Sequence, residues 1–427
     1  MRRLFAHICL LAVMFGAVGS AQTVTLNGLI ASWIDPNSPE TAQELRDLYA
    51  QFAAEHPDIQ INWDVQGYDQ LQQKLLTSAA AGSLPDFAFV DSIWVQQLAG
   101  LGALQPLDEL WPQEDRADYK DPFIEGAMYD GALYAVWDST DTRVLWYNTA
   151  IFEEAGLAPN QPPTTWEELT EYARAITETG RVGLGLALGT HEYVTADVVL
   201  PMFWGLGGEL LDDEGRPVFH EGENLAAMTQ VLEFLGTLRD EGLVPTDLLQ
   251  LQGGDALYPG MVTGQYGMVI GNNILRDAVL QDLAPDTYTQ WEAAVLPAPT
   301  GGEPSSMNGG FTWAITTDDP EKQRAAWAFI SFWNSPEVQL ARYKPTAQVA
   351  VRESTAQDAF YGTPFWETVN EAVSVGQTRP GVAVYPVLSQ AIQNAVQQFL
   401  AGGGSAEDAV VAAGETAVAE FERQQQR

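Results

Sequence analysis

Residues 129–157 read YDGALYAVWDSTDTRVLWYNTAIFEEAGL, and this stretch decides the fold. A glycine turn leads into an apolar strand that ends at Trp137, Asp138 and Asp141, and residues 144–147 predict a second strand before a helix. Aromatic and acidic side chains at strand ends suit a sugar, because a ring stacks on its apolar face while carboxylates bind its hydroxyls. The alternative is an ordinary strand–loop–strand with a tryptophan in the core.

Strands and helices alternate on the N-terminal side of this stretch. We expect strands at 24–30, 59–63 and 87–90, with one helix beginning at Ser38-Pro39-Glu40 and another spanning 68–81. This β-α-β-α-β order predicts a parallel sheet with ligands at the carboxyl ends of its strands. Further signals are strand patterns at 182–188 and 267–270, a capping box at Thr165-x-x-Glu168, and helix starts at Asp319-Pro320 and Ser335-Pro336.

The first residues predict export. Arg2 and Arg3 precede an apolar run too short to span a bilayer, and Gly19-Ser20-Ala21 supplies a cleavage site. We therefore expect residues 1–21 to be a signal peptide. The single cysteine, Cys9, lies inside the apolar run, which is wrong for a lipid-attachment site. The mature chain is expected to be soluble, periplasmic or extracellular, and free of disulfides and thiolate metal sites.

The mature chain is large enough for two domains and strongly acidic. Removing residues 1–21 from 427 leaves 406, and losing Arg2 and Arg3 lowers the formal net charge from −37 to −39. Such a surface repels nucleic acid and anionic lipid, so we expect neither as a partner. A saline habitat explains this acidity, and an incidental bias of a high-GC genome explains it equally.

Five segments resemble the carbohydrate-binding proteins of bacterial ABC transporters, extracellular solute-binding protein family 1. The stretch 129–157 is similar to the hinge-crossing pattern "G-x-LYGVP…D-x-xxLYYN-x-xLFEKAGL", and 67–110 to "gYddyxQKLxaaxAaGxxPDVvxxDxxxxxxlaxxGxLxPLDxL". Residues 203–228, 261–273 and 295–339 are similar, in the family's order, to its "GGxllDxxG", "FxxGxxAMxxxGxW" and "GGxxxAI…AAWxFxxFxxSPExQ" patterns.

The resemblance implies an α/β fold of two lobes, the type II periplasmic-binding-protein fold, with each lobe a mainly parallel sheet flanked by helices. Carried over, lobe one is residues 22–137 and 295–345, and lobe two is residues 138–294 and 346–427. Several hinge crossings are expected to join the lobes around one solute.

The same resemblance implies a set of ligand contacts in the cleft. Acids that accept sugar hydroxyls, rings that stack, a glycine for close approach, amides and one reaching arginine make up this set: Trp33, Asp91, Trp137, Asp138, Asp141, Trp204, Asn272, Asn273, Gly310, Phe311 and Arg379. Asn272 and Asn273 depart from the family, which often has a tryptophan there, and this puts the size of the ligand in doubt.

Each of these positions has a structural alternative. Trp33 and Trp204 are equally consistent with core packing, Asp91 with a helix N-cap, the two asparagines with a turn, and Arg379 with a salt bridge to the acidic surface. His56, His191 and His220 are isolated and lack ligand spacing, so we expect no metal and no cofactor.

The sequence thus predicts a monomeric, non-enzymatic binding protein that delivers a sugar to the permease of an ABC transporter. Two other solutes stay open: a polyamine, which acids and tryptophans suit, and glycerol phosphate, which would need a basic cleft. An exported glycoside hydrolase is the enzyme alternative, because it needs aromatics and only two carboxylates.

Overall fold

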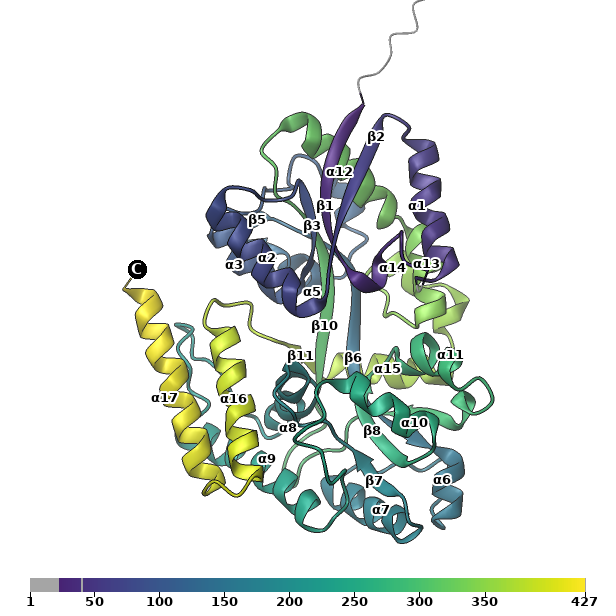
Figure 1. Ribbon diagram of the computed structural model, residues 1–427, viewed down its shortest axis with the longest axis vertical. Helices are drawn as coiled ribbons and strands as arrows, with labels where there is room; N and C mark the ends of the chain where they lie inside the picture. The colour runs from purple at the N-terminus through teal and green to yellow at the C-terminus, as the bar shows by residue number, and fades with distance from the viewer. Residues whose placement is uncertain (1–22, 40, 427) are drawn as a thin grey trace, which may run out of the picture.

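The protein is described by a computed structural model that covers residues 23–39 and 41–426, so the predicted signal peptide lies outside the described residues. Two bodies, one above the other, surround separate hydrophobic cores (Figure 1). Leu26, Phe89 and Trp313 belong to the core of lobe one, and Leu184 and Leu235 to that of lobe two. The predicted two-lobed α/β architecture is confirmed.

The sheet of lobe one is built from the predicted β-α-β-α-β order. Its strands β1 (Val24–Ala31), β2 (Ile59–Gln66) and β3 (Phe87–Asp91) pair in parallel in the order β2-β1-β3. Helix α2 (Tyr68–Ala81) ends at Gly82, whose φ of 64° forms a left-handed cap that glycine adopts without strain. The other helices of this lobe are α1 (Gln43–Glu55), α3 (Val95–Gly100), α4 (Gln113–Arg116), α5 (Asp121–Glu125), α12 (Pro320–Trp333), α13 (Pro336–Thr346) and α14 (Glu353–Ala356), beside a small hairpin of β4 (Met128–Tyr129) and β5 (Ala132–Leu133).

Helix α1 begins later than Ser38-Pro39 predicts. Asp35 and Ser38 form consecutive turns instead: Asn37 N–H donates to Asp35 Oδ1 at 2.9 Å, and Thr41 N–H donates to Ser38 O at 3.3 Å. The Arg46 guanidinium also donates to Ser38 O at 3.1 Å. The turns and Arg46 thus satisfy backbone groups before Gln43 without a helical turn, and helix α1 begins only at Gln43.

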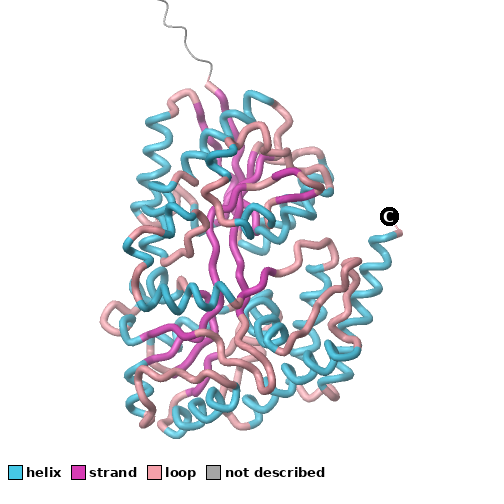
Figure 2. Tube along the Cα trace, turned by 180° about the vertical axis from the view of Figure 1, so that it is seen from behind, coloured by secondary structure: helices cyan, strands magenta, loops and turns pink. Residues whose placement is uncertain are grey.

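The segment read as two strands is one continuous strand, β6 (Val136–Asn148). Its first half pairs antiparallel with β10 (Ser306–Ile315) and its second half pairs antiparallel with β8 (Tyr266–Asn272). The polar stretch in its middle, which suggested a loop, is satisfied by β10, since Thr140 Oγ1 donates to Gly309 O at 2.7 Å. Strand β6 therefore passes from one lobe into the other without interruption (Figure 2).

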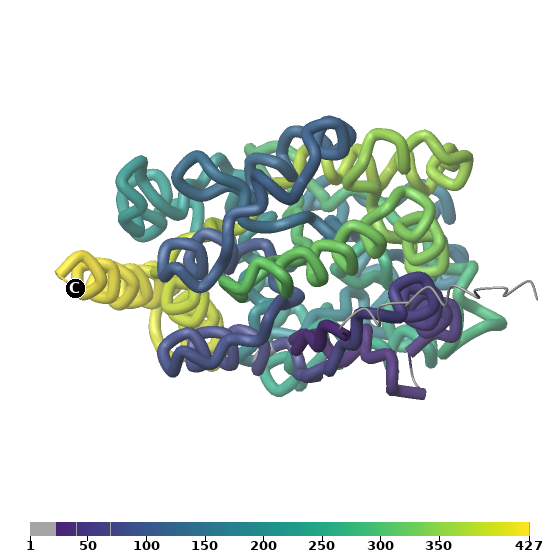
Figure 3. The backbone as a smooth tube through the Cα atoms, turned by 90° about the horizontal axis from the view of Figure 1, so that it is seen from above, coloured from purple at the N-terminus to yellow at the C-terminus, as the bar shows by residue number. Residues whose placement is uncertain are grey.

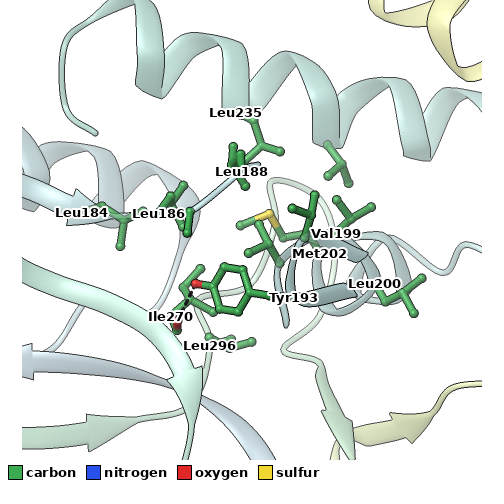
Figure 4. Packing of buried hydrophobic residues seen from close by; sticks show 14 of the residues in the cluster. Leu184, Leu186, Leu188, Tyr193, Val199, Leu200, Met202, Leu235, Ile270 and Leu296 are labelled. Carbon is green, nitrogen blue, oxygen red and sulfur yellow. Dashed lines mark hydrogen bonds between the residues drawn. The ribbon is translucent and has the colours of Figure 1, made fainter. Parts of the chain in front are cut away.

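The sheet of lobe two is mixed rather than mainly parallel. Strand β7 (Val182–Gly185) pairs in parallel with β8, but β8 and β9 (Trp291–Ala294) both run antiparallel to β6. Its core includes Tyr193, whose phenol donates to Ile270 O at 2.8 Å among leucines and valines (Figure 4). Its helices are α6 (Thr149–Glu154), α7 (Trp166–Glu178), α8 (Leu200–Gly205), α9 (Gly222–Asp240), α10 (Tyr258–Val262), α11 (Gln281–Leu283), α15 (Pro364–Ser374), α16 (Tyr385–Leu400) and α17 (Ala406–Gln425), the last at one end of the molecule (Figure 3).

The exact lobe boundaries stay a prediction, and two contacts favour moving them. Leu296 packs in the core of lobe two, and Ala298 forms a β-bridge with Thr165, so residues 295–305 belong with lobe two. Arg352 pairs with Asp118 of lobe one at 3.1 Å, so α14 belongs with lobe one. Strands β6 and β10 and the passage from α14 to α15 then form the hinge, with β11 (Gly376–Thr378) beside β10.

Candidate functional site

A cavity of about 320 Å³ lies between the two lobes. Its volume is at the lower end of the range for small-molecule sites, which span about 300–1,000 Å³. Lobe one contributes Tyr68, Gln72, Ile93 and Trp94, and lobe two contributes Thr190, His191, Glu192, Gln252, Tyr385, Pro386, Gln390 and Gln393.

The wall from lobe one follows from strand order. Tyr68 is the first residue of α2, directly after β2, and Trp94 lies in the 3₁₀ turn after β3. Both therefore stand at the carboxyl ends of parallel strands, where ligands of α/β sheets bind. Asp91, which ends β3, accepts from Ile93 N–H at 3.2 Å, so the predicted capping role of Asp91 is real.

A guanidinium behind the cavity wall joins carboxylates from the two lobes. Arg379 Nη2 donates to Asp91 Oδ2 at 3.0 Å, and Arg379 Nη1 donates to Glu192 Oε1 at 3.1 Å. Arg379 is 7% exposed and Asp91 is 2% exposed. Burial opposes the charge of Arg379, but Asp91 and its other acidic neighbours outweigh burial and hold the pKa of this guanidinium well above its ordinary value. The two carboxylates therefore share one permanent cation.

Two phenols in the cavity wall donate their hydrogens to the same carboxylates. Tyr68 Oη donates to Asp91 Oδ2 at 2.7 Å, and Tyr385 Oη donates to Glu192 Oε1 at 2.6 Å. Burial, and then the adjacent carboxylate, raise the pKa of both phenols well above the ordinary value. Both phenols stay protonated, and their oxygen lone pairs are left to accept hydrogen bonds from a ligand.

Aromatic rings continue the wall of lobe one beyond the cavity. The ring centroids of Tyr68 and Trp94 are 5.6 Å apart, and those of Tyr68 and Phe311 are 6.3 Å apart in an edge-to-face arrangement. Phe311 stacks on Phe89 at 4.7 Å and contacts Trp33 at 5.4 Å. Trp33 is 46% exposed, so it is not a core residue. Of the predicted contacts, Trp33, Phe311, Asp91 and Arg379 thus gather around the cavity wall.

Trp137 and Asp138 lie inside lobe one, contrary to the prediction that they face a ligand. Trp137 is 3% exposed and packs on Phe123 with centroids 4.9 Å apart. Asp138 is 4% exposed, accepts from Trp313 Nε1 at 3.0 Å and pairs with Arg342 at 3.1 Å. The carboxylate is fully used by protein groups, as a buried charge requires.

The close approach expected at Gly310 is to protein. Its φ is 153°, and a Cβ here would lie 2.4 Å from the backbone oxygen of Ser139 and 2.5 Å from the Trp137 ring. The glycine is therefore required where β10 pairs with β6 beside a large indole. This is a correction of the role that the resemblance implied.

Four more predicted contacts serve the hinge or the core of lobe two. Asp141 pairs with Arg143 at 2.6 Å. Asn272 accepts through its backbone oxygen from Trp146 Nε1 at 2.8 Å. Asn273 is fully buried, and its amide accepts from Thr142 N–H and donates to Ala347 O, at 2.9 and 2.7 Å. Trp204 is 7% exposed within the lobe-two core. None of the four lines the cavity in the part of the chain that is described.

The sequence reading missed most of the residues that do line the cavity. Tyr68 and Trp94 lie inside the 67–110 signature, and their positions after β2 and β3 could have identified them. Gln393 is a polar residue on the largely apolar buried face of α16, which is a usable signal, whereas Gln390, one turn earlier, is exposed. Glu192 lies in the helical residues of lobe two just before Val194–Val199, and only the folded structure brings it to Arg379.

Within residues 23–39 and 41–426, no helix combines the length and apolarity needed to cross a membrane. The same residues contain no group of His, Cys, Asp and Glu side chains arranged to hold a metal ion.

Comparison with known proteins agrees with this architecture. An ABC transporter solute-binding protein from Thermotoga lettingae TMO, bound with alpha-D-tagatose, is 26% identical; the likeness covers 92% of this chain and 98% of that one, with a TM-score of 0.80. A cyclic alpha-maltosyl-1,6-maltose binding protein from Arthrobacter globiformis is 26% identical, over 94% and 100% of the two chains, with a TM-score of 0.75.

An uncharacterized lipoprotein of Streptomyces antibioticus is 27% identical over 400 residues, which cover 90% of this chain and 84% of that protein. The sequence profile of the bacterial extracellular solute-binding proteins matches residues 35–340. The chain therefore has the fold of a type II periplasmic binding protein and belongs to the family of bacterial extracellular solute-binding proteins.

Proposed function

We propose that this protein binds a neutral sugar in the cavity between its lobes and delivers it to the permease of an ABC transporter. The observation that carries the proposal is the cavity wall, where aromatic rings stand beside phenol, amide and imidazole groups. Rings stack on the apolar faces of a sugar, and the polar groups exchange hydrogen bonds with its hydroxyls. A volume of about 320 Å³ favours a small sugar over a long oligosaccharide.

The electrostatics of the site argue against a charged ligand. A polyamine would need open carboxylates, but Asp91 and Glu192 are already paired with Arg379. A phosphate ester would need an available cation, yet the lining residues include no lysine or arginine among those described, and Arg379 is buried behind the wall. A neutral polyol requires neither kind of charge.

A glycoside hydrolase is also disfavoured. Such an enzyme places the scissile bond between two carboxylates. Here the carboxylates of Asp91 and Glu192 both accept hydrogen bonds from the Arg379 guanidinium that lies between them. We infer binding without chemistry, by an exported protein that acts as a monomer.

A melting-temperature screen tests the proposal. Maltose, D-tagatose, mannotriose, spermidine and glycerol 3-phosphate are added in separate arms, each at several concentrations. A ligand at about 100 times its dissociation constant stabilises the folded protein by roughly 2.7 kcal/mol. We expect a neutral sugar to raise the melting temperature. Stabilisation by spermidine or glycerol 3-phosphate alone would move the assignment to that solute, and release of shorter sugars on incubation would make the protein an enzyme.

A further inference from the structure

His191 differs from the other polar groups of the cavity in the direction of its hydrogen bond. Its ring atom Nδ1 accepts from the backbone N–H of Tyr193 at 3.1 Å. A neutral imidazole carries one hydrogen, so a ring whose Nδ1 accepts carries that hydrogen on Nε2. The free end of His191 is therefore a hydrogen-bond donor, whereas Tyr68 and Tyr385 present acceptor oxygens.

The imidazole is held in this orientation from several sides. Tyr193, which supplies the N–H, is anchored in the lobe-two core by the bond from its phenol to Ile270 O (Figure 4). The backbone oxygen of His191 accepts from Val194 N–H at 3.0 Å. The ring also lies close to Gly253, since a Cβ added there would come within 3.3 Å of Cε1. A ring fixed in this way loses little conformational freedom when a ligand binds.

We propose that His191 is a specificity-determining residue of this site, whose Nε2–H donates to an oxygen of the bound sugar. The inference rests on the proposed function and adds to it the residue that recognises one oxygen of the sugar. The Nε2–H of His191 favours a sugar that has an acceptor oxygen at that position. It disfavours any ligand group that can only donate hydrogens there, because two donors would then face each other.

Two substitutions separate the donor from the rest of the ring. His191→Asn places an amide near the position of Nδ1, where it can still accept from Tyr193 N–H, but it removes the group at Nε2. His191→Gln is longer and places an amide N–H near the position of Nε2. Affinity is measured by calorimetry with whichever of maltose, D-tagatose and mannotriose the wild-type protein binds most tightly.

We expect His191→Asn to weaken binding about 5- to 100-fold, because a sugar oxygen is left buried without its donor. His191→Gln is expected to bind within about 3-fold of the wild type. With the monodeoxy analogues of the same sugar, removal of one particular oxygen should abolish the difference between wild type and His191→Asn. Equal affinity of wild type and His191→Asn for a sugar that binds, or an undiminished difference across all analogues, would overturn the assignment while leaving sugar binding intact. If the wild type binds none of the three sugars, the proposed function and this inference fall together.

A second measurement does not depend on the affinity of any variant. The protein is labelled with ¹⁵N-histidine, and the His191 signals are assigned by their loss in His191→Asn. We expect the Nε2–H tautomer in the free protein and a shift of the Nε2 resonance on saturation with the sugar. An Nδ1–H tautomer, or an Nε2 resonance that does not shift on saturation with the sugar, would contradict the proposal.

Discussion

At the scale of single residues, Gly310 shows how one position can be essential for a reason that its motif conceals. The Gly–Phe pair invites a ligand-binding interpretation, but the atoms nearest to a Cβ at 310 belong to Ser139 and Trp137. The conflict at Ser139 is with backbone, which cannot rotate away as a side chain can.

We therefore expect Gly310→Ala to destabilise the protein strongly, by more than about 3 kcal/mol, through steric conflict and a backbone conformation that alanine rarely adopts. Gly271→Ala is the matched control in strand β8, which also pairs with β6, because its added Cβ would meet only ordinary contacts, at 3.8 and 3.9 Å. Denaturant unfolding of both variants makes the comparison. Equal stability of the two would show that β10 can move away from β6.

Arg379 is the second residue whose effect should reach beyond its own contacts. Arg379→Met removes the cation shared by Asp91 and Glu192 and leaves two acids next to each other, one of them deeply buried. Breaking a buried ion pair costs about 3–5 kcal/mol. Arg174→Met removes an ion pair with Glu241 that is largely exposed, so its loss should change the free energy of unfolding far less than the loss of Arg379. A loss at Arg379 no larger than that at Arg174 in chemical unfolding would refute this account.

At the scale of elements, helix α17 is fixed by a contact between a glycine and a histidine. A Cβ on Gly414 of α17 would lie 1.8 Å from Cγ of His220, so helix and loop are in direct contact. The surrounding positions of the helix, including Ala413 and Ala417, are buried as well. Small residues at this seam allow α17 to dock closely against lobe two.

Gly414→Ala should lower the free energy of unfolding by about 1–3 kcal/mol, because the extra methyl group overpacks the seam. The exposed neighbour position provides the control, Ala412→Ser, with a change within about 0.5 kcal/mol. Amide exchange along α17 is the readout. Faster exchange in Gly414→Ala only is the expected pattern, and unchanged exchange would mean that the backbone segment carrying His220 shifts away from the helix.

The same histidine predicts a pH dependence. Burial lowers the pKa of His220, and Arg216 adds to this, although Glu221 opposes it. The unfolded chain therefore binds a proton at higher pH than the folded chain does. The contribution is constant above the unfolded value of about 6.5 and is lost as pH falls below it. His220→Gln should flatten the decline in stability between about pH 7 and pH 5; a parallel decline in both proteins would exclude His220 as its cause.

Elements were also what the sequence predicted best, and the reasons are local. Helix α2 has a glycine on either side of it, and Asp319 caps α12 by accepting from the N–H of Glu321 and Lys322. Neighbouring residues in the sequence therefore determine where these helices begin or end. Strand β6 could not be read as one strand, because the groups that satisfy its polar middle come from β10, far along the chain. The pairing inside the site could not be predicted for a similar reason, since Asp91 and Arg379, both expected at the cleft, become partners only after folding.

At the scale of the whole molecule, the excess of acids dominates. The formal net charge is −37 over the full sequence. Exposed like charges repel one another, and salt shortens the range of that repulsion to about 10 Å at 0.1 M. The sequence has 20 lysines and arginines against 57 aspartates and glutamates, so most of the acids have no basic residue to offset them.

Stability should therefore rise with added NaCl, most steeply at low concentration, where the screening length changes fastest. Affinity for a neutral sugar should change much less, since such a ligand has no charge to screen. Melting curves and titrations at low and high NaCl test the two halves separately. A melting temperature indifferent to salt would remove the repulsion argument, and salt-sensitive binding would favour a charged solute.

The exposed indole of Trp33 gives the molecule a built-in optical probe. Thirteen tryptophans occur in the sequence, and Trp33 is the one that stands among the exposed large apolar side chains of the described residues. It touches Phe311, which in turn meets Tyr68 at the cavity wall. Collisional quenching by iodide acts on chromophores that solvent can reach, so it should sample Trp33 far more than the buried indoles. If the lobes approach each other when ligand is added, iodide should quench Trp33 less. The rate of this change, followed in a stopped-flow instrument, would give the rate of lobe closure with no dye attached.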